Sequence, residues 1–255
     1  MQLSTAARNL GSRIAGIVRT IPEIMVPGTC LVCEKHVREQ GGCCPQCWSR
    51  LRFISRPYCP VMGTPFSIDM GSGLLSAEAI AEPPPFDRLR AVMLYDDVAR
   101  KLVASVKYSD RTDLVPWIAN WMAVAGAELV EHADMIIPVP LHPSRLHARR
   151  FNQAGEMARH VCRSAGKPFQ PECLIRKRRT KQQVGLSERA RARNVSGAFV
   201  VPEQKKADVK GKAVLLVDDV YTTGATSKAA ARALKRGGAS QVDVLVFAKV
   251  ETVAT

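Results

Sequence analysis

The stretch VLLVDDVYTTGAT, residues 214–226, decides the fold class of this chain. An apolar run with strand character stops at two adjacent carboxylates, Asp218 and Asp219, and then passes through threonines and a glycine into a helical pattern. Charged side chains are costly at the end of a buried strand unless they are paired or bind something. In α/β sheets, ligands bind beyond the carboxyl ends of the strands, so the acidic pair marks a candidate ligand site.

The segments around this stretch alternate between strand and helix patterns. Apolar runs predict strands within 91–95, 133–140, 197–201, 212–220 and 241–250. Amphipathic patterns predict helices within 98–109, 113–130, 151–166 and 222–238. This alternation predicts an α/β fold with a mainly parallel sheet and helices on both faces.

The loop after the acidic pair has the features of a phosphate cradle. A helix N-terminus offers unpaired N–H groups, threonine hydroxyls add donors, and Gly224 permits a close approach of the backbone. Two carboxylates just before such a loop can accept hydrogen bonds from vicinal hydroxyls, which points to a ribose phosphate. One alternative is a magnesium ligand of a nucleotide hydrolase, but the chain has no GxxxxGK[ST] loop. Another is a helix N-cap, which explains one aspartate better than two.

A cluster of cysteines near the N-terminus has the spacing of a zinc ribbon. Two CxxC knuckles, separated by ten residues, supply the four soft ligands of tetrahedral zinc: Cys30, Cys33, Cys44 and Cys47. Cys43 is an alternative to Cys44, and a redox dithiol is an alternative use of one knuckle. A site closed by four thiolates has no open position for catalysis, so the ribbon is expected to be a scaffold or a docking surface.

Three further cysteines fall outside this ligand set. Met62 stands where a thiolate would complete another knuckle with Cys59, so we expect one structural zinc and no second one. Cys59, Cys162 and Cys173 are expected to be ordinary buried thiols.

Charge and hydropathy limit the compartment and the partners. The formal net charge is +14, and residues 145–193 hold fourteen Lys or Arg against three Glu, which predicts an anionic partner such as a phosphate, pyrophosphate or nucleic acid. A solvated basic surface is the alternative. No apolar run is long enough for a membrane span, and the N-terminus reads as an amphipathic helix, so we expect a cytoplasmic protein.

We predict three parts along the chain. An N-terminal amphipathic helix occupies 1–27, a zinc-ribbon module with its connection occupies 28–82, and the α/β domain occupies 83–255, where three consecutive prolines at 83–85 mark the boundary. A basic stretch at about 176–195 is expected to be a lid that closes over an anion.

The acidic pair with TTGAT resembles the phosphoribosyl pyrophosphate (PRPP) signature of type I phosphoribosyltransferases. The resemblance implies that Asp218 and Asp219 hold the ribose 2′- and 3′-hydroxyls. It also implies that a loop binds the 5′-phosphate through Thr222, Thr223, Gly224, Ala225 and Thr226. With the four-cysteine ribbon, PVPLHPSRLHARRFNQA and RKRRTKQQVGLSERARARNVSGAF, the chain from about Cys30 onward resembles the ComF family, a competence-associated, amidophosphoribosyltransferase-like group.

This resemblance also implies the rest of the site. A pyrophosphate loop would be formed by Val139, Pro140, Leu141 and His142, with charge from Arg145, Arg149 and Arg150; Gln183 and Arg191 match the family pattern in the lid. Magnesium would accompany PRPP. Two functions stay open: transfer of phosphoribosyl to an unidentified nitrogen acceptor, or a non-catalytic PRPP-binding protein that handles single-stranded DNA in natural transformation. The ribbon would then offer a surface for a protein of the competence machinery.

Overall fold

A computed structural model describes residues 28–69, 71, 73–108, 111–142, 152–178, 180 and 187–251. The helix predicted for 1–27 lies outside the described residues. The chain divides into two compact units between Arg50 and Leu51, and each is considered by itself. Among the described residues, no helix combines the length and the apolar character needed to cross a bilayer.

The first unit is small and has little apolar core. It holds the antiparallel strands β1 (Gly28–Thr29) and β2 (His36–Val37) and the helix α2 (Pro45–Trp48). In its described part the buried apolar side chains are those of Cys30, Leu31 and Cys47. So few buried groups cannot offset the entropy lost on ordering the chain, so this unit needs another source of stability.

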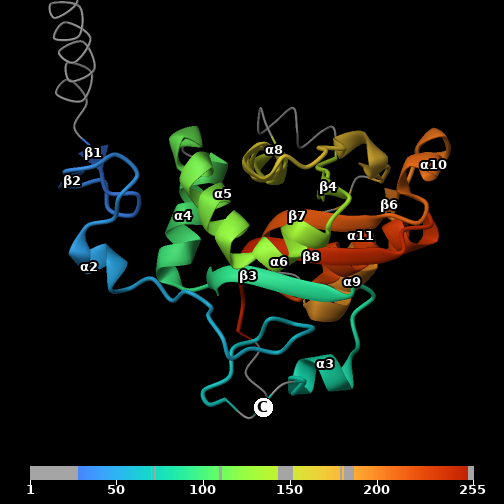
Figure 1. The fold of residues 1–255 in the computed structure, drawn as a ribbon, viewed down its shortest axis with the longest axis horizontal. Helices are drawn as coiled ribbons and strands as arrows, with labels where there is room; N and C mark the ends of the chain where they lie inside the picture. Colours follow the sequence, from blue (N-terminus) through green and yellow to red (C-terminus); the bar gives the residue numbers. More distant parts are fainter. Residues whose placement is uncertain are drawn as a thin grey trace, which may run out of the picture. The chain divides into compact units, whose positions relative to one another are not determined.

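The second unit is built on the predicted parallel sheet (Figure 1). Its strand order is β3 (Arg88–Leu94), β8 (Gln241–Lys249), β7 (Ala213–Tyr221) and β4 (Met135–Pro138), and all three pairings are parallel. The strand expected within 197–201 is β6 (Phe199–Val200), which pairs antiparallel with β5 (Ile175–Arg176) outside this sheet.

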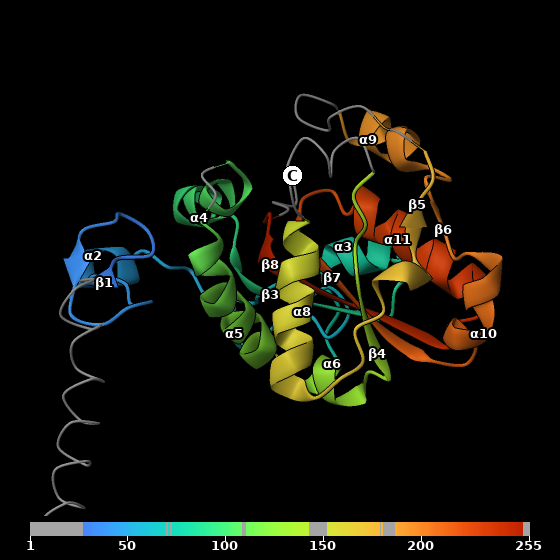
Figure 2. The same cartoon turned by 90° about the horizontal axis from the view of Figure 1, so that it is seen from above.

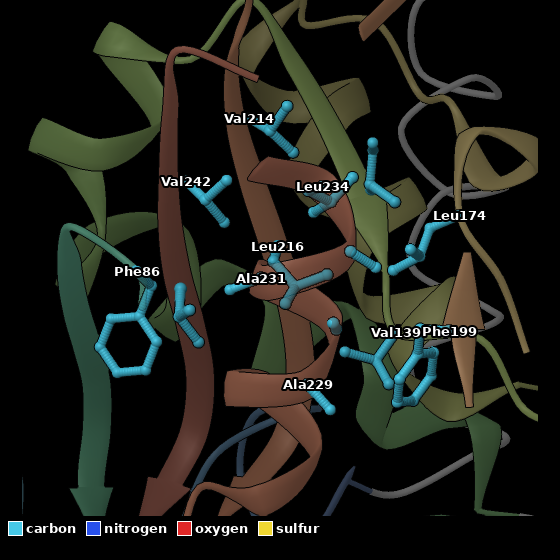
Figure 3. Close-up of a cluster of buried hydrophobic side chains, with 14 of the residues drawn as sticks. Phe86, Val139, Leu174, Phe199, Val214, Leu216, Ala229, Ala231, Leu234 and Val242 are labelled. Atoms are coloured by element: carbon cyan, nitrogen blue, oxygen red, sulfur yellow. The ribbon is translucent and has the colours of Figure 1, made fainter. Parts of the chain in front are cut away.

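Helices cover both faces of the sheet, as predicted (Figures 1 and 2). Alternate side chains of β7 point to opposite faces, so Val214 and Leu216 meet Ala231 and Leu234 of α11 (Ala225–Arg236), as Figure 3 shows. The other face packs against α5 (Val115–Ala125) and α8 (Gln153–Ala165), which also contact each other. Because all pairings are parallel, the carboxyl ends of the strands lie together at one edge of the sheet.

The helical segment predicted at 113–130 is divided in the structure. It consists of the 3-10 turn η1 (Thr112–Leu114), α5, and α6 (Ala127–His132). The break falls at Gly126, where a Cβ atom would lie 2.7 Å from a methyl carbon of Leu245 in β8. Glycine therefore lets the turn between the two helices lie against the sheet.

The other elements surround this frame. They are α3 (Ala77–Ala81), α4 (Asp97–Tyr108), η2 (Pro171–Cys173), α9 (Glu188–Val195), η3 (Glu203–Lys205) and α10 (Lys206–Val209).

The segment just after residue 50 belongs to the second unit and pairs with the edge of its sheet. Ile54 donates its N–H to the Val92 carbonyl (2.9 Å), and Leu89 donates to the Val61 carbonyl (2.7 Å), so this connection extends the edge of β3. We predicted that the ribbon module and its connection end at residue 82, whereas the compact units divide after Arg50.

Candidate functional site

The acidic pair lies at the carboxyl edge of the sheet, near the C-terminal end of β7. The strand does not stop at Val217; it continues through both aspartates to Tyr221, still paired with β8. On its other side β4 ends at Pro138, opposite Val217, and the next residue, Val139, donates its N–H to the Val217 carbonyl (2.8 Å). The loop after β4 therefore begins directly beside Asp218.

The two carboxylates have different surroundings. Asp219 forms an ion pair with Lys107 of α4, whose Nζ lies 2.5 Å from Oδ2, and both side chains are about four-fifths buried. Asp218 Oδ1 accepts the N–H of Asp219 (2.9 Å). Burial, together with the neighbouring Asp219 carboxylate, raises the pKa of Asp218 to about 7, although the positive charges of Lys107 and Arg176 act in the opposite direction. The pair therefore combines a carboxylate held by a cation with one that titrates near neutral pH.

The loop between β7 and α11 is tight and has unused hydrogen-bond donors. Gly224 precedes α11 in the left-handed conformation, with φ at 73°, and a Cβ atom there would lie 2.1 Å from Oη of Tyr221. The N–H groups of Thr222, Thr223 and Gly224 donate to no backbone carbonyl of the described residues. The buried Oγ1 of Thr223 likewise has no hydrogen-bond partner among them. These donors are suited to an anion such as a phosphate.

The predicted pyrophosphate loop begins beside the acidic pair. The structure describes its residues 139–142. Val139 is buried, and its carbonyl accepts from the Asn152 side chain (3.1 Å), so both of its backbone groups are already used. Pro140, Leu141 and His142 follow as half-buried residues. The predicted residues Arg145, Arg149 and Arg150 lie outside the described residues.

The segment predicted as a lid is partly a structural element of the domain. Its first residue, Arg176, is buried in β5, lies over the Phe199 ring at 5.2 Å and bonds to Thr180. The later part forms α9, which is capped by the Ser187 side chain and packs against α11. Gln183 lies outside the described residues.

Arg191 of the predicted lid is half-buried on α9. Its Nε is buried and has no hydrogen-bond partner among the described residues. A buried guanidinium donor without a hydrogen-bond partner is unfavourable. The unsatisfied donor of this residue is therefore suited to binding an anion.

Sequence reasoning missed Lys107 and Tyr221 as members of the site. Lys107 lies in the last turn of an ordinary amphipathic helix, and only the packing of α4 brings it to Asp219. Tyr221 is buried below Gly224, where its ring makes an edge contact with Phe86 at 6.2 Å. The sequence shows a tyrosine three residues before the glycine, but the burial of its ring is seen only in the structure.

The cysteine cluster forms one compact ligand set in the first unit. The Sγ atoms of Cys30, Cys33, Cys44 and Cys47 all lie within 4.8 Å of one another, and Cys43 is not part of the group. Burial acts to raise the pKa of Cys30, but N–H donors of Cys33 and Cys44 outweigh it and lower that pKa to about 6. Four converging thiols, one of them biased toward the thiolate, fit a structural zinc ion.

The remaining cysteines of the prediction are buried, as expected. Cys59 and Cys173 lie in the main apolar core, and Cys162 is 5% exposed on α8. Cys59 Sγ accepts the N–H groups of Met62 and Ser76 at 3.4 and 3.3 Å.

Comparisons with known proteins agree with this architecture. A family model described as a double zinc ribbon domain matches residues 21–79, and one described as a phosphoribosyl transferase domain matches residues 152–252. The chain is thus of the class that joins a zinc ribbon to a phosphoribosyltransferase-type domain.

The relatives narrow this class to one family. DNA utilization protein YhgH of Shigella flexneri is 31% identical over 230 residues, which cover 87% of this chain and 96% of the relative. Competence protein F of Haemophilus influenzae is 25% identical over 86% of this chain and 96% of its own length. Competence protein ComFC of Bacillus subtilis is 26% identical over 78% and 80%. The chain belongs to the ComF family that these proteins represent.

Proposed function

We propose that this protein binds PRPP and transfers its phosphoribosyl group to a nitrogen nucleophile with release of pyrophosphate. The observation that supports this most strongly is the position of Asp218 and Asp219 at the carboxyl edge of the sheet, immediately before a phosphate-type loop. A ribose 5-phosphate presents two vicinal hydroxyls, which suit the two carboxylates, and one phosphate, which suits the loop.

The aspartates would hold the ribose. Asp219, kept in place by Lys107, would accept a hydrogen bond from one ribose hydroxyl. Asp218 would accept from the other in its ionised form, which is the minor form below pH 7 because its pKa is raised. The 5′-phosphate would take the free N–H groups of the loop and the unpartnered hydroxyl of Thr223.

Magnesium fits this edge of the sheet. Carboxylate oxygens are the ligands that Mg²⁺ prefers, and those of Asp218 and Asp219 would lie next to the ribose of the proposed PRPP ligand. When bound with PRPP, the ion supplies charge neutralisation to the diphosphate leaving group.

The chemistry of the transfer would rest on the leaving group. The bond from the anomeric carbon to the pyrophosphate oxygen breaks, its electron pair leaves with pyrophosphate, and the nitrogen lone pair forms the new C–N bond. A transition state of oxocarbenium character is helped by cations near the diphosphate, a role open to Arg191. The proton lost by the nitrogen goes to water or to the released pyrophosphate.

The test is a measurement of pyrophosphate release from PRPP and Mg²⁺ over a broad panel of nitrogenous acceptors. The variant that combines Asp218→Asn and Asp219→Asn serves as the blank. Release above the blank with at least one acceptor is expected. A panel with no release above the blank removes the transferase proposal and leaves a non-catalytic PRPP-binding protein.

A second candidate function is the handling of single-stranded DNA. The relatives are named for DNA utilization and competence, and Lys177 and Arg178 expose basic side chains beside α9. Arg178 is partly engaged, because it donates to the carbonyls of Asn194 and Ser196. This proposal predicts that oligo(dT) binding weakens with added salt and with Lys177→Ala plus Arg178→Ala. Affinity that responds to neither change would refute it.

A further inference from the structure

A cavity of about 590 Å³ lies along α11, on the side that faces α9. Its lining includes five cationic side chains and one carboxylate: Arg189, Arg193, Lys228, Arg232, Arg236 and Glu82. A volume of this size suits a small molecule rather than a few waters.

The cations form two rows. Arg189 and Arg193 are four residues apart on α9, and Lys228, Arg232 and Arg236 follow the same spacing on α11. Residues four apart share one face of a helix, so each row directs its charges to the same side, at a rise of about 6 Å per step. The packing of α9 against α11 brings both rows to one cavity.

Most of this charge is not neutralised within the described part of the chain. There, Lys228 pairs with Glu82 at 3.1 Å, whereas the four arginines of the cavity form no ion pair. Elsewhere in the same unit many cations do have carboxylate partners, for example Arg88 with Asp243 at 2.7 Å. A concave cluster of like charges is repulsive until an anion enters it.

The cavity shares two residues with the proposed phosphate loop but otherwise lies apart from the proposed PRPP site. Thr223 and Ala225 line it, so it begins at the phosphate loop and follows the helix away from it. Neither Asp218 nor Asp219 is among its lining residues. Lys228 lines the cavity and is itself buried.

We propose that this cavity is a second anion site, which binds a compact ligand with several phosphate groups. A guanidinium group can donate two parallel hydrogen bonds to the oxygens of one phosphate. Four guanidinium groups around one cavity can therefore bind more than one phosphate group. Small side chains, Ala192 and Ala229, form its apolar wall, and no aromatic ring is among the described residues that line it. Without rings for stacking bases, the cavity is suited to a compact polyphosphate group better than to a single-stranded polynucleotide.

The test uses inorganic tripolyphosphate as the probe, titrated by calorimetry into the full-length protein at constant ionic strength without divalent metal. The cavity variant combines Arg232→Gln and Arg236→Gln. The matched control removes the same charge at exposed positions away from the cavity, by Arg163→Gln and Lys212→Gln. Thermal unfolding of all three proteins checks their folding.

We expect one tripolyphosphate per chain, an affinity at least tenfold weaker in the cavity variant, and less than a threefold change in the control. The variant with Asp218→Asn and Asp219→Asn should bind the probe no more weakly than the wild type, and the cavity variant should bind PRPP within about fivefold of the wild type. If PRPP fails to bind while the probe result holds, the proposed function falls and the second site stands.

Four results would overturn the proposal. The wild type does not bind the probe; the control loses as much affinity as the cavity variant; the cavity variant loses PRPP binding in step with the probe, which would merge the two sites; or oligo(dT) binds through Arg232 and Arg236 while tripolyphosphate does not. If the cavity variant is unfolded, the same measurements on Arg189→Gln with Arg193→Gln decide the matter.

Discussion

The thiol cluster of the first unit and the acidic pair of the second unit are built in opposite ways. In the first unit four thiols converge to within 4.8 Å of one another, in a module with very few buried apolar residues. In the second unit, two carboxylates stand side by side at the edge of a well-packed sheet. In the loop that follows, several N–H groups donate to no backbone carbonyl, and the Thr223 hydroxyl has no hydrogen-bond partner, in the part of the chain that the structure describes. The thiol cluster leaves no position for a further ligand, whereas the acidic pair and its loop have groups available to bind one.

The difference separates structural stability from ligand binding. The thiol cluster replaces a missing core, because a metal held by four ligands supplies the free energy of folding that burial does not. The second unit has a large apolar core of its own, and the acidic site adds to it a carboxyl with a raised pKa, a left-handed glycine and a hydroxyl without a partner among the described residues. Such unfavourable features persist where a ligand needs them.

Removal of the zinc ligands is expected to have the largest effect, confined to the first unit. Cys33→Ser with Cys47→Ser should lower bound zinc from about one to less than about 0.2 per chain, since structural zinc contributes on the order of 10 kcal/mol. PRPP affinity should stay within about twofold of the wild type. Zinc analysis and calorimetry on the same sample measure both. A loss of PRPP binding would show that the thiol cluster and the acidic site depend on each other.

Substitution of Gly224 tests the acidic site through its backbone. Gly224→Ala should weaken PRPP binding at least thirtyfold and lower stability by about 2–4 kcal/mol, because the residue is left-handed and its Cβ would collide with Tyr221. Gly211→Ala is the matched control, since its φ is also 73° but no atom lies within 4 Å of the added carbon. Equal effects of the two changes in chemical denaturation would remove the role given to Tyr221.

The raised pKa of Asp218 predicts a gain in stability when the carboxyl is removed. Folding favours the protonated form, so the stability that the wild type has below about pH 4 is lost as pH rises to about 7. Asp218→Asn should therefore be more stable by about 1–4 kcal/mol at pH 8, and this advantage should shrink by about 1.4 kcal/mol per unit between pH 7 and pH 4.

Thermal unfolding at pH 8 and pH 5.5 measures this difference. Asp97→Asn, an exposed acid on α4, serves as a control and should change stability by no more than about 0.5 kcal/mol. A destabilised Asp218→Asn at pH 8 would contradict the account of this carboxyl.

Neutralising Lys107 should have the smallest of these effects. Lys107→Met removes the partner of Asp219 and should weaken PRPP binding about three- to tenfold at pH 7.5, because the positive charge that lowers the pKa of Asp218 is lost and Asp219 is no longer held in place. Lys101→Met, exposed on the same helix, should leave the affinity unchanged. No difference between the two variants would exclude Lys107 from the site.

The sequence predicted the frame of the site well and its supporting contacts poorly. The parallel sheet and the compact four-cysteine group agree with the predictions, since strand periodicity and ligand spacing are local patterns. Lys107 and Tyr221 could not be found in this way, because their roles come from contacts between distant segments. Arg176 shows the same limit, for a basic residue in a basic stretch proved to be buried against Phe199.

The central claim is that the acidic pair binds the ribose of PRPP, and calorimetric titration with PRPP and Mg²⁺ tests it most directly. The account predicts one PRPP per wild-type chain and an affinity at least a hundredfold weaker for Asp218→Asn with Asp219→Asn, at equal zinc content and with a folded second unit. A double variant that binds PRPP within threefold of the wild type would contradict it.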